Sequence, residues 1–421
     1  MSLKLSKSTI AQYLLLYLLL LTQGAAAILN NQQLWNLGLL GFAAIILLTN
    51  SYKIRSDFFL VMGGIVGGII FTRFLNGGVG LDVLIQYCAR VAGAYAFVLI
   101  DRRRCAERFI KTVAFFSVTS IVFFTLLNIV KTLLPIVLFQ RGFTPNGVQF
   151  DYNFFFAYNH FGTSDIVIRN TSIYTEPALF AMVLIFAMYM CLYVPDVLNL
   201  SQKKISRYHL IFVITMITTM STTGYAVSIV MYLLYIVQKS DKKMRKRIII
   251  ASICVLILAV LEAVVRKEDS IVLTKFIYKL FSEGDTGKMA FDLSAGTGRY
   301  RISAIATAWS VFLGNPLGSG YDKLMDTLIS TSLYGSASSG GGLMREIAAF
   351  GLITSSALFY YLIKGAKKLS GNAACTCVFI TCYVICTLSS SSMFYAVPIL
   401  VASMGMGGLR SEEKSRNEFI S

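Results

Sequence analysis

Two arginines stand between glycines in the stretch GTGRYR, which runs from Gly296 to Arg301 and leads directly into an apolar segment. A guanidinium group is permanently charged, and its planar set of N–H donors matches phosphate or carboxylate oxygens. The start of a helix adds further N–H donors and a partial positive charge. Arg299 and Arg301 are therefore predicted either to bind a phosphate group or to anchor a helix to lipid headgroups, and the stretch itself leaves both interpretations open.

A second pattern of charge lies in RNTSIYTEP, where Arg169 precedes Glu176 and Pro177. Glu176 is expected just inside the end of an apolar span, where an ionisable group needs a partner or a water-filled cavity. It is predicted to act as a general base that takes a proton from a hydroxyl group, or else to pair with an arginine. His160 and Asp165 are the next candidates for the base.

The composition determines the setting in which these residues act. The chain has 421 residues, of which 56% are hydrophobic and only 14% charged, and apolar runs long enough to cross a bilayer recur along its whole length. Such runs are typical of an all-α polytopic integral membrane protein. No separate soluble domain is evident, so residues 1–421 are predicted to form a single membrane domain.

About twelve helices are predicted to cross the membrane. A signal peptide is not expected at the first of them, because the run is too long and leads into a second span. The predicted spans are 9–29, 34–50, 57–75, 81–100, 112–139, 172–195, 209–220, 226–238, 248–265, 343–363, 373–388 and 393–409.

Basic residues set the predicted orientation. The loops SYKIRS, DRRRCAERFIK, SQKKISR, KSDKKMRKR and KGAKK alternate with NNQQ, NGGVG and SSSS, which carry no charge. Placing the basic loops and both termini in the cytoplasm puts almost all of the formal net charge of +17 on one face. Because this charge is spread over short loops, it is a topology signal, and nucleic-acid binding is not expected.

Two segments on the opposite, outer face are too long to be simple turns, namely residues 140–171 and 266–340. The first is rich in aromatic residues. The second contains SIVLTKFIYKLF and the apolar run that follows Arg301, which ends at Gly314. That run has about 12 residues and a rise of about 18 Å, too short to span the bilayer core, so it is predicted to be an interfacial helix.

Further charged and polar groups are expected near the outer ends of the spans. Arg345 and Glu346 begin one span and could pair with Glu176 and Arg169. The positive-inside bias works against cations at this face, so arginines there need a cause other than topology. The residues predicted to bind a ligand are Arg73, Arg90, Arg141, His160, Tyr321 and Arg345.

Two segments resemble a known family. RNTSIYTEPALFAMVL resembles the Arg-x-x-(small)-x-(aromatic)-x-Glu-Pro segment of bacterial O-antigen polymerases of the Wzy type. GTGRYRISAIATAWSVFLGNPLGSGYD is similar to a Gly-Arg…Trp…Phe…Pro-Leu-Gly-x-Gly segment shared by O-antigen polymerases and ligases. The layout of two large outer loops among many spans also matches, so the resemblance extends over most of the chain.

The resemblance implies a glycosyltransferase of the bacterial inner membrane that acts at the periplasmic face. A growing glycan would leave undecaprenyl pyrophosphate and join the sugar of a carrier-linked repeat unit. Its partners would be these lipid-linked donor and acceptor glycans, membrane lipid and a chain-length regulator. Arginines can stabilise the charge on a pyrophosphate leaving group without a metal, so no cofactor or metal is expected. Arg169, Arg299 and Arg301 are the predicted catalytic cations.

Aromatic residues of the first large loop have two possible roles, namely contact with sugars of the substrate and packing against the membrane spans. Tyr152, Phe154, Phe155, Phe156 and Tyr158 could stack on sugar rings, and packing against the spans is the stronger expectation.

Two departures from the family pattern bear on this prediction. The ligases are expected to carry a catalytic histidine in the second large loop, and residues 266–340 contain none, which favours a polymerase over an O-antigen ligase. Polymerases are also described by a glycine eleven residues after the loop arginine. Here Phe180 and Phe312 occupy those positions after Arg169 and Arg301.

A transporter or flippase for the same lipid is the alternative class. It would also need an arginine-lined cavity, but such proteins usually have inverted repeats and short loops on both sides. The sequence has no evident repeat and two long outer segments. The short apolar runs within 209–238 and 373–409 could still be halves of broken helices, which keeps this alternative open.

Overall fold

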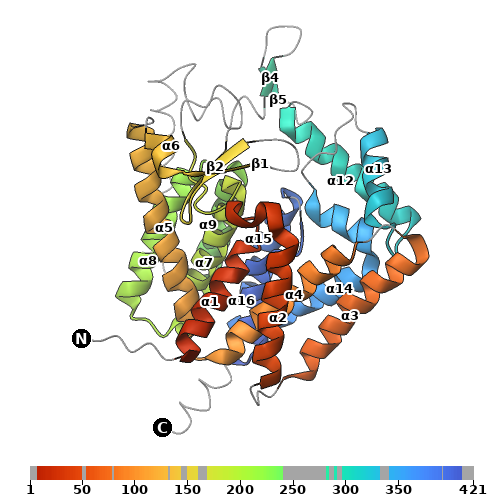
Figure 1. Cartoon of the computed structure of the whole chain (residues 1–421), viewed down its shortest axis with the longest axis horizontal. Helices are drawn as coiled ribbons and strands as arrows, with labels where there is room; N and C mark the ends of the chain where they lie inside the picture. Colours follow the sequence, from red (N-terminus) through yellow and green to blue (C-terminus); the bar gives the residue numbers. More distant parts are fainter. Residues whose placement is uncertain are drawn as a thin grey trace.

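The computed structural model describes residues 7–49, 54–77, 80–130, 133–143, 149–159, 168–239, 281–283, 289–291, 296–331, 341–390 and 392–409. Within these residues the chain is mostly helical and carries two small antiparallel sheets (Figure 1). The elements are α1 (Lys7–Leu21), η1 (Ala26–Asn31), α2 (Gln32–Thr49), α3 (Ser56–Asn76), α4 (Leu81–Ile100), α5 (Cys105–Ile129), α6 (Leu134–Val137), β1 (Gln140–Phe143), β2 (Gln149–Tyr152), β3 (Ala157–Asn159), α7 (Pro177–Tyr193), η3 (Pro195–Leu198), α8 (Gln202–Thr219), α9 (Thr222–Lys239), β4 (Phe281–Glu283), β5 (Met289–Phe291), α12 (Gly296–Gly314), α13 (Tyr321–Thr331), α14 (Gly342–Ser370), α15 (Ala373–Leu388) and α16 (Ala396–Met406).

Five helical segments in the described part of the chain are long and apolar enough to cross a membrane. They are Ala26–Thr49, Ser56–Asn76, Leu81–Ile100, Cys105–Ile129 and Gly342–Ser370. Several of the other helices, such as α7 and α15, are apolar but shorter. The helical class and the apolar helices are therefore confirmed. The number of about twelve crossings stays a prediction, and the span predicted at 248–265 lies outside the described residues.

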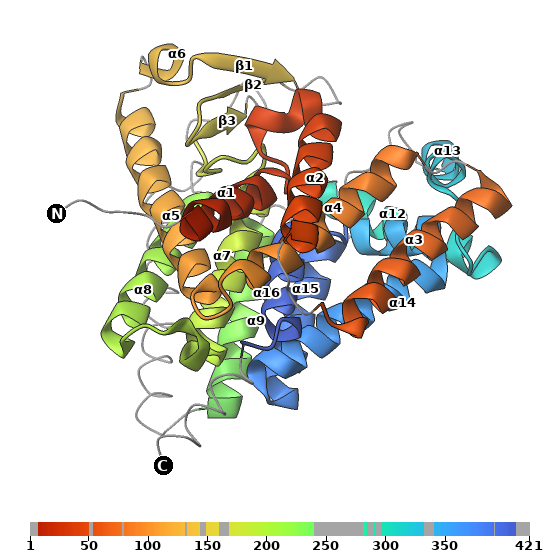
Figure 2. The ribbon, with the colours of Figure 1, turned by 60° about the horizontal axis from the view of Figure 1, so that its bottom comes forward.

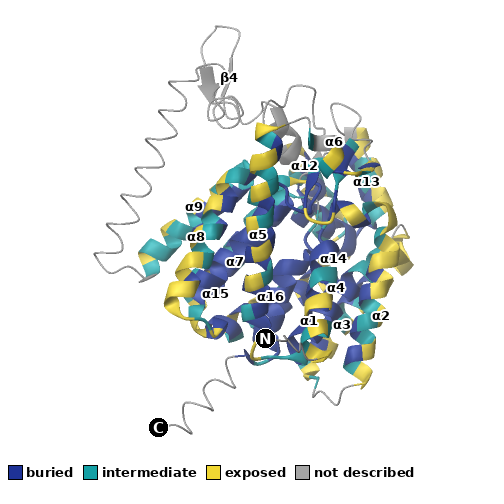
Figure 3. Cartoon of the chain, turned by 60° about the vertical axis from the view of Figure 1, so that its left-hand side comes forward, coloured by how far each residue is buried: buried dark blue, intermediate teal, exposed yellow. Residues whose placement is uncertain are grey.

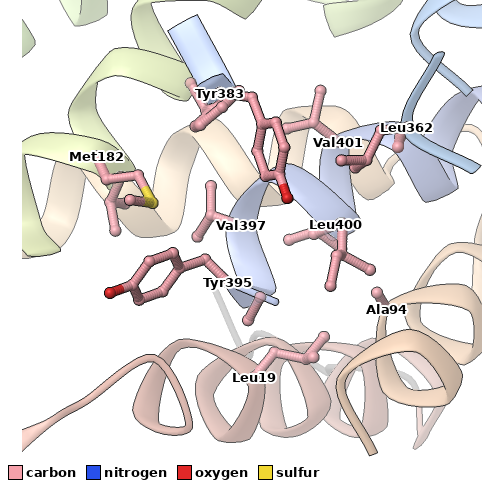
Figure 4. Packing of buried hydrophobic residues seen from close by; sticks show 14 of the residues in the cluster. Leu19, Ala94, Met182, Leu362, Tyr383, Tyr395, Val397, Leu400 and Val401 are labelled. Carbon is pink, nitrogen blue, oxygen red and sulfur yellow. The ribbon is translucent and has the colours of Figure 1, made fainter. Parts of the chain in front are cut away.

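The core is built around α7 and α16, which are apolar on every side. Nearly all residues of α7 from Leu179 to Tyr193 are buried, as is all of α16 (Figure 3). A helix that is apolar all round must be surrounded by other elements. Figure 4 shows Val397, Leu400 and Val401 of α16 among side chains of α1, α4, α7, α14 and α15.

Helices α14 and α16 touch through their backbones. A Cβ atom built on Gly405 would overlap the carbonyl of Gly365, so both positions accept only glycine without a shift of the helices. Small residues at such a crossing let the two backbones approach closely. Inside a bilayer, where the hydrophobic effect does not drive helices together, the van der Waals packing of such a close contact stabilises the pair.

The outward faces of the peripheral helices are apolar as well. Leu48, Phe74, Ile129 and Val237 are each more than three quarters exposed, and Figure 3 shows exposed residues, in yellow, along α5. An apolar surface of this extent is unusual for a soluble monomer and is compatible with contact with lipid.

Several of the short basic loops, where the structure describes them, come together at one end of the molecule, called here the basic end. Arg108 at the start of α5 forms an ion pair of 2.9 Å with Asp101 and also donates to the side-chain oxygen of Gln12 in α1. Asn199 donates to the carbonyl of Arg103, 2.6 Å away, which brings the start of α8 to the same place.

A second cluster extends this end toward α3 and α14. Asp57 accepts hydrogen bonds from Lys364 at 2.7 Å and from Lys368 at 2.9 Å. The backbone N–H of Arg55 donates to the hydroxyl of Tyr95, near the last turns of α4. The described parts of the basic loops that the sequence assigns to one face are thus gathered at one end of the fold, and residues 240–247 lie outside the described part of the chain.

A three-stranded sheet lies at the opposite end. Its strands follow the order β1-β2-β3, with Gln140 paired to Tyr152 and Tyr152 to Ala157. Figure 2 shows the sheet beside η1, and Phe150 and Ala157 are buried there against Ala26. The first predicted large loop therefore contains a small folded layer, which the all-helical prediction did not include.

Some predicted boundaries are wrong. The first predicted span, 9–29, is divided, because α1 ends at Leu21 and the chain turns at Gly24, where φ is 101°. The span predicted at 112–139 begins at Cys105 and ends at Ile129. Hydropathy placed its start too late, because Arg108 is charged but is neutralised by Asp101.

Candidate functional site

The predicted RNTSIYTEP segment is non-helical, turns at Ser172 and is held by buried side-chain amides. The side chain of Asn170 donates to the hydroxyl oxygens of Thr218 at 2.8 Å and Ser120 at 3.1 Å. Asn128 of α5 holds the backbone N–H and C=O of Ile168 at 2.9 and 3.1 Å. Buried polar groups remain stable only with such partners, so the path of this segment is closely specified.

The same segment joins the turn that follows α1. The N–H of Ala26 donates to the carbonyl of Ile173 at 2.9 Å, and the N–H of Thr175 donates to that of Gly24 at 3.2 Å. Glu176 then precedes α7 with extended backbone angles, as expected for a residue before proline. Its side chain is exposed at the start of the helix, where an anion interacts favourably with the helix dipole.

Arg90 connects this turn to a segment near the C-terminus. It is 3% exposed, donates to the carbonyl of Phe394 at 2.7 Å and also donates to the carbonyl of Thr22. Next to it, Glu346 accepts the backbone N–H of Met393 at 2.8 Å. The predicted cation Arg90 thus lies inside the fold, with its charge directed at backbone carbonyls.

These contacts form one continuous chain of hydrogen bonds. It leads from Thr175 to the turn 22–24, through Arg90 to residues 393–394, and from there to Glu346 at the start of α14. The two charged motifs of the sequence, 169–176 and 345–346, are therefore joined at the end of the molecule opposite the basic loops. We call this region the motif end.

Arg345 is positioned by the first residue of α13. Its guanidinium group donates to the hydroxyl of Tyr321 at 2.9 Å, contacts the sulfur of Met325 at 3.3 Å and lies 5.9 Å from the centre of the Tyr321 ring. Two residues that the sequence predicted separately as ligand contacts are thus brought together. Arg345 is buried, so the pair of Arg345 and Tyr321 is part of the packed structure at the motif end.

Helix α14 is broken six residues further on. Gly351 has φ 74° and ψ −177°, which interrupts the helix and leaves nearby backbone groups without helical partners. The segment 316–320 supplies them: Ser319 and Gly320 donate to the carbonyls of Ala348 and Ala349, and Leu352 donates to the carbonyl of Pro316. The PLGSG motif therefore completes a broken helix.

Helix α12 begins earlier than predicted. It starts at Gly296, so Arg299 and Arg301 lie within its first turns and not in a flexible loop before it. Arg301 is one turn from Ile305, whose side chain lies beside Gly341 at the start of α14. The placement of the two arginine side chains lies outside the described part of the structure.

The remaining predicted residues are distributed more widely. Arg73 is exposed in the last turn of α3, and Arg141 on β1 forms an ion pair of 3.1 Å with Asp151. The Nε atom of Arg169 is buried and has no hydrogen-bond partner among the described residues. His160 and Asp165, like residues 270–280 of the predicted amphipathic stretch, lie outside those residues.

The aromatic residues of the first loop divide into two groups. Phe156 is fully buried beside Leu127 and Ile168, which confirms the expectation of packing. Phe154 and Phe155 are exposed and remain accessible to a ligand.

Comparison with known proteins assigns no family, since no family model and no curated protein matches the chain. The fold and the site together define a helical protein with several apolar helices of membrane-spanning length and a charged motif end.

Proposed function

We propose that this chain is an integral membrane glycosyltransferase that polymerises lipid-linked oligosaccharide repeat units, as the resemblance to O-antigen polymerases implies. The observation that carries the proposal is the chain of hydrogen bonds that joins residues 169–176 to Glu346, the neighbour of Arg345, opposite the basic end. With the basic end in the cytoplasm, the motif end faces the periplasm of a bacterial inner membrane.

In the proposed reaction the bond between the sugar's anomeric carbon and the pyrophosphate oxygen of the donor breaks. The acceptor hydroxyl forms a new bond to that carbon, and its proton passes to Glu176, which is exposed at the motif end. Undecaprenyl pyrophosphate leaves with the electron pair. Arg169, Arg299 and Arg301 stabilise its growing negative charge, and no metal is required.

The test is elongation by the purified protein in liposomes that contain lipid-linked repeat units. We expect a ladder of lipid-linked products that persists in excess EDTA. Arg169→Lys, Arg299→Lys and Arg301→Lys should each slow transfer about 100- to 1000-fold, since lysine loses the bidentate contact. Arg207→Lys is the matched control, because Arg207 is exposed on α8 at the basic end. Normal ladders from all three variants would contradict the proposal.

Orientation needs its own test. Cysteine at Lys203, which is exposed near the basic end, should be protected from a membrane-impermeant thiol reagent in intact cells, whereas cysteine at Phe154 should react. Cys377 is exposed and should first be replaced by serine. The reverse labelling pattern would place the motif end in the cytoplasm and exclude periplasmic transfer.

The break in α14 favours a transporter as a second candidate, because discontinuous helices are typical of transporters. The segment 316–320 occupies the break with hydrogen bonds, however, so the break does not line a cavity there. Movement of a fluorescent lipid-linked glycan across protein-containing liposomes, without elongation, would support that candidate over the polymerase.

A further inference from the structure

A pocket of about 500 Å³ opens at the motif end between the start of α2 and the start of α4. Its walls are formed by residues 30–33, with the sequence NNQQ, together with Asn36, Asp82 and Gln86, and by two leucines. The volume lies within the range of about 300–1,000 Å³ that is usual for small-ligand sites. None of these residues belongs to the predicted charged set.

Asn36 shows that the pocket is not a simple surface hollow. This side chain is only 2% exposed, and its Oδ1 atom has no hydrogen-bond partner among the described residues. A buried amide oxygen without a partner has lost its hydrogen bond to water and gained none in return, which is unfavourable. Asn36 is a wall residue of the pocket, and its covered amide oxygen would accept from a ligand donor once the side chain turns toward the cavity.

The chemistry of the walls selects the kind of ligand. Carboxamides offer both donors and acceptors without charge, which matches the hydroxyl and acetamido groups of sugars. A phosphate would need cations, and the described residues that line the pocket include none. A divalent cation would need several carboxylates, whereas Asp82 is the single acidic residue among these described residues.

The pocket adjoins the chain of hydrogen bonds at the motif end. Gln86 and Arg90 are one turn apart on α4, so they share a helix face. The η1 segment that carries Asn30 and Asn31 begins at Ala26, whose N–H is bonded to Ile173. A group bound in the pocket would therefore lie next to the segment that precedes Glu176.

We propose that this pocket, called here the amide pocket, binds an uncharged sugar residue of the glycan substrate. The proposal rests on the proposed function for the identity of the glycan, but sugar binding itself requires no transfer. In this proposal residues of α2 and α4 recognise the glycan, whereas Arg169, Arg299 and Arg301 bind the pyrophosphate.

The test is saturation-transfer NMR on the full chain in lipid nanodiscs, because maltoside detergents would offer a competing sugar. The probes are glucose, galactose and N-acetylglucosamine at millimolar concentration. We expect transfer from the wild-type protein to at least one of them. Asn36→Leu and Gln86→Leu should each weaken that binding about tenfold, the equivalent of about 1.4 kcal/mol.

A stability measurement separates binding from folding. Since Asn36→Leu removes an unpaired buried acceptor, the variant should melt no lower than the wild type. Gln238→Leu is the matched control: Gln238 also has an amide oxygen without a described partner, but it lies at the end of α9 and outside the amide pocket. Its sugar binding should equal that of the wild type.

No transfer to any of the three sugars, or equal transfer to the wild type and the Asn36→Leu, Gln86→Leu double variant, would overturn the inference. A protein that elongates lipid-linked units but shows this result would keep the proposed function and lose the amide pocket. A protein that binds sugar through the amide pocket but does not elongate lipid-linked units would keep the inference and contradict the proposed function.

Discussion

The segments 168–176 and 315–320 both lie at the motif end, but they are fixed to the helical bundle in different ways. The first is held by backbone bonds to the turn after α1 and, in addition, by its own Asn170 and by Asn128 of α5. The second contributes only backbone groups, which bond to the backbone of α14 and to the side chains of Thr72 and Asn76. The bonds of Asn170 depend on the identity of a residue within the segment, whereas the bonds of the second segment to α14 depend on backbone shape.

This difference indicates which substitutions should destabilise each segment. A side-chain contact can be removed at the cost of one or two hydrogen bonds. A backbone junction fails as a whole when a side chain is forced into it, because the interior is close-packed. We therefore expect the largest effects at glycines of the 315–320 junction and smaller effects at the amides.

The largest effect is expected from Gly351→Ala. The backbone at Gly351 has φ 74°, and an added Cβ would overlap the carbonyl group of Leu317. Strain of this kind costs about 1–3 kcal/mol before the steric overlap is counted, so we expect little folded protein. Size-exclusion chromatography after extraction measures it. Gly63→Ala is the control, since nothing lies near its Cβ position and alanine favours the helix. Equal yields of both variants would contradict the importance of the junction.

Asn170→Ala should have the next largest effect. It removes the hydrogen bonds to Thr218 and Ser120 and leaves buried partners without a donor. We expect a loss of about 2–6 kcal/mol of stability, from about 1–3 kcal/mol for each of the two uncompensated groups. Thermal unfolding in nanodiscs measures the loss. Thr119→Ala, which removes an exposed hydroxyl bonded within its own helix, should change little.

Thr72→Val distinguishes the two segments most directly. The Thr72 hydroxyl lies 2.9 Å from the carbonyl of Leu317 and 3.2 Å from that of Phe350, and valine has the same shape without the hydroxyl. We expect a cost of about 1 kcal/mol. Hydrogen exchange should become faster at residues 317–320 and stay unchanged at 168–176. Faster exchange in both segments would show that they are one cooperative unit.

The smallest effect is expected from Arg141→Ala. Arg141 pairs with Asp151, but its side chain is 65% exposed. An exposed pair of this kind contributes about 0.2–1 kcal/mol, and added salt should reduce even that. Unfolding at low and high ionic strength measures the difference. A loss comparable to that of Asn170→Ala would mean that the sheet, like the segment it covers, depends on individual side chains.

Much of the fold could be predicted because hydrophobicity is a local property. The apolar runs place α2, α3, α4 and α15 to within a few residues, since a helix of that length and composition needs no further partner to be recognised. The basic loops that the structure describes, at residues 101–108, 199–207 and 364–368, lie at one end, whereas the orientation of that end in a membrane stays a prediction. Asn315 and Pro316 mark the end of α12 by their own chemistry.

The site depended on partners far apart in the sequence. The sequence showed Arg90 and Arg345 as cations, but only packing decides that Arg90 is bonded to Thr22 and Phe394 and that Arg345 is bonded to Tyr321. The sequence shows which residue types could act, and so it identifies Arg169, Glu176 and Glu346 as candidates. Only the tertiary structure shows that they lie at one end of the molecule.

What the sequence by itself determined is therefore the set of helices, their apolar faces and the candidate charged motifs. The tertiary structure alone decided the break at Gly351, the unpaired oxygen of Asn36 and the amide pocket. The physical reason is the range of the interactions. A run of apolar residues determines its own helix, but a broken helix or an unpaired amide is defined by the groups that other segments bring, or fail to bring, within hydrogen-bond distance.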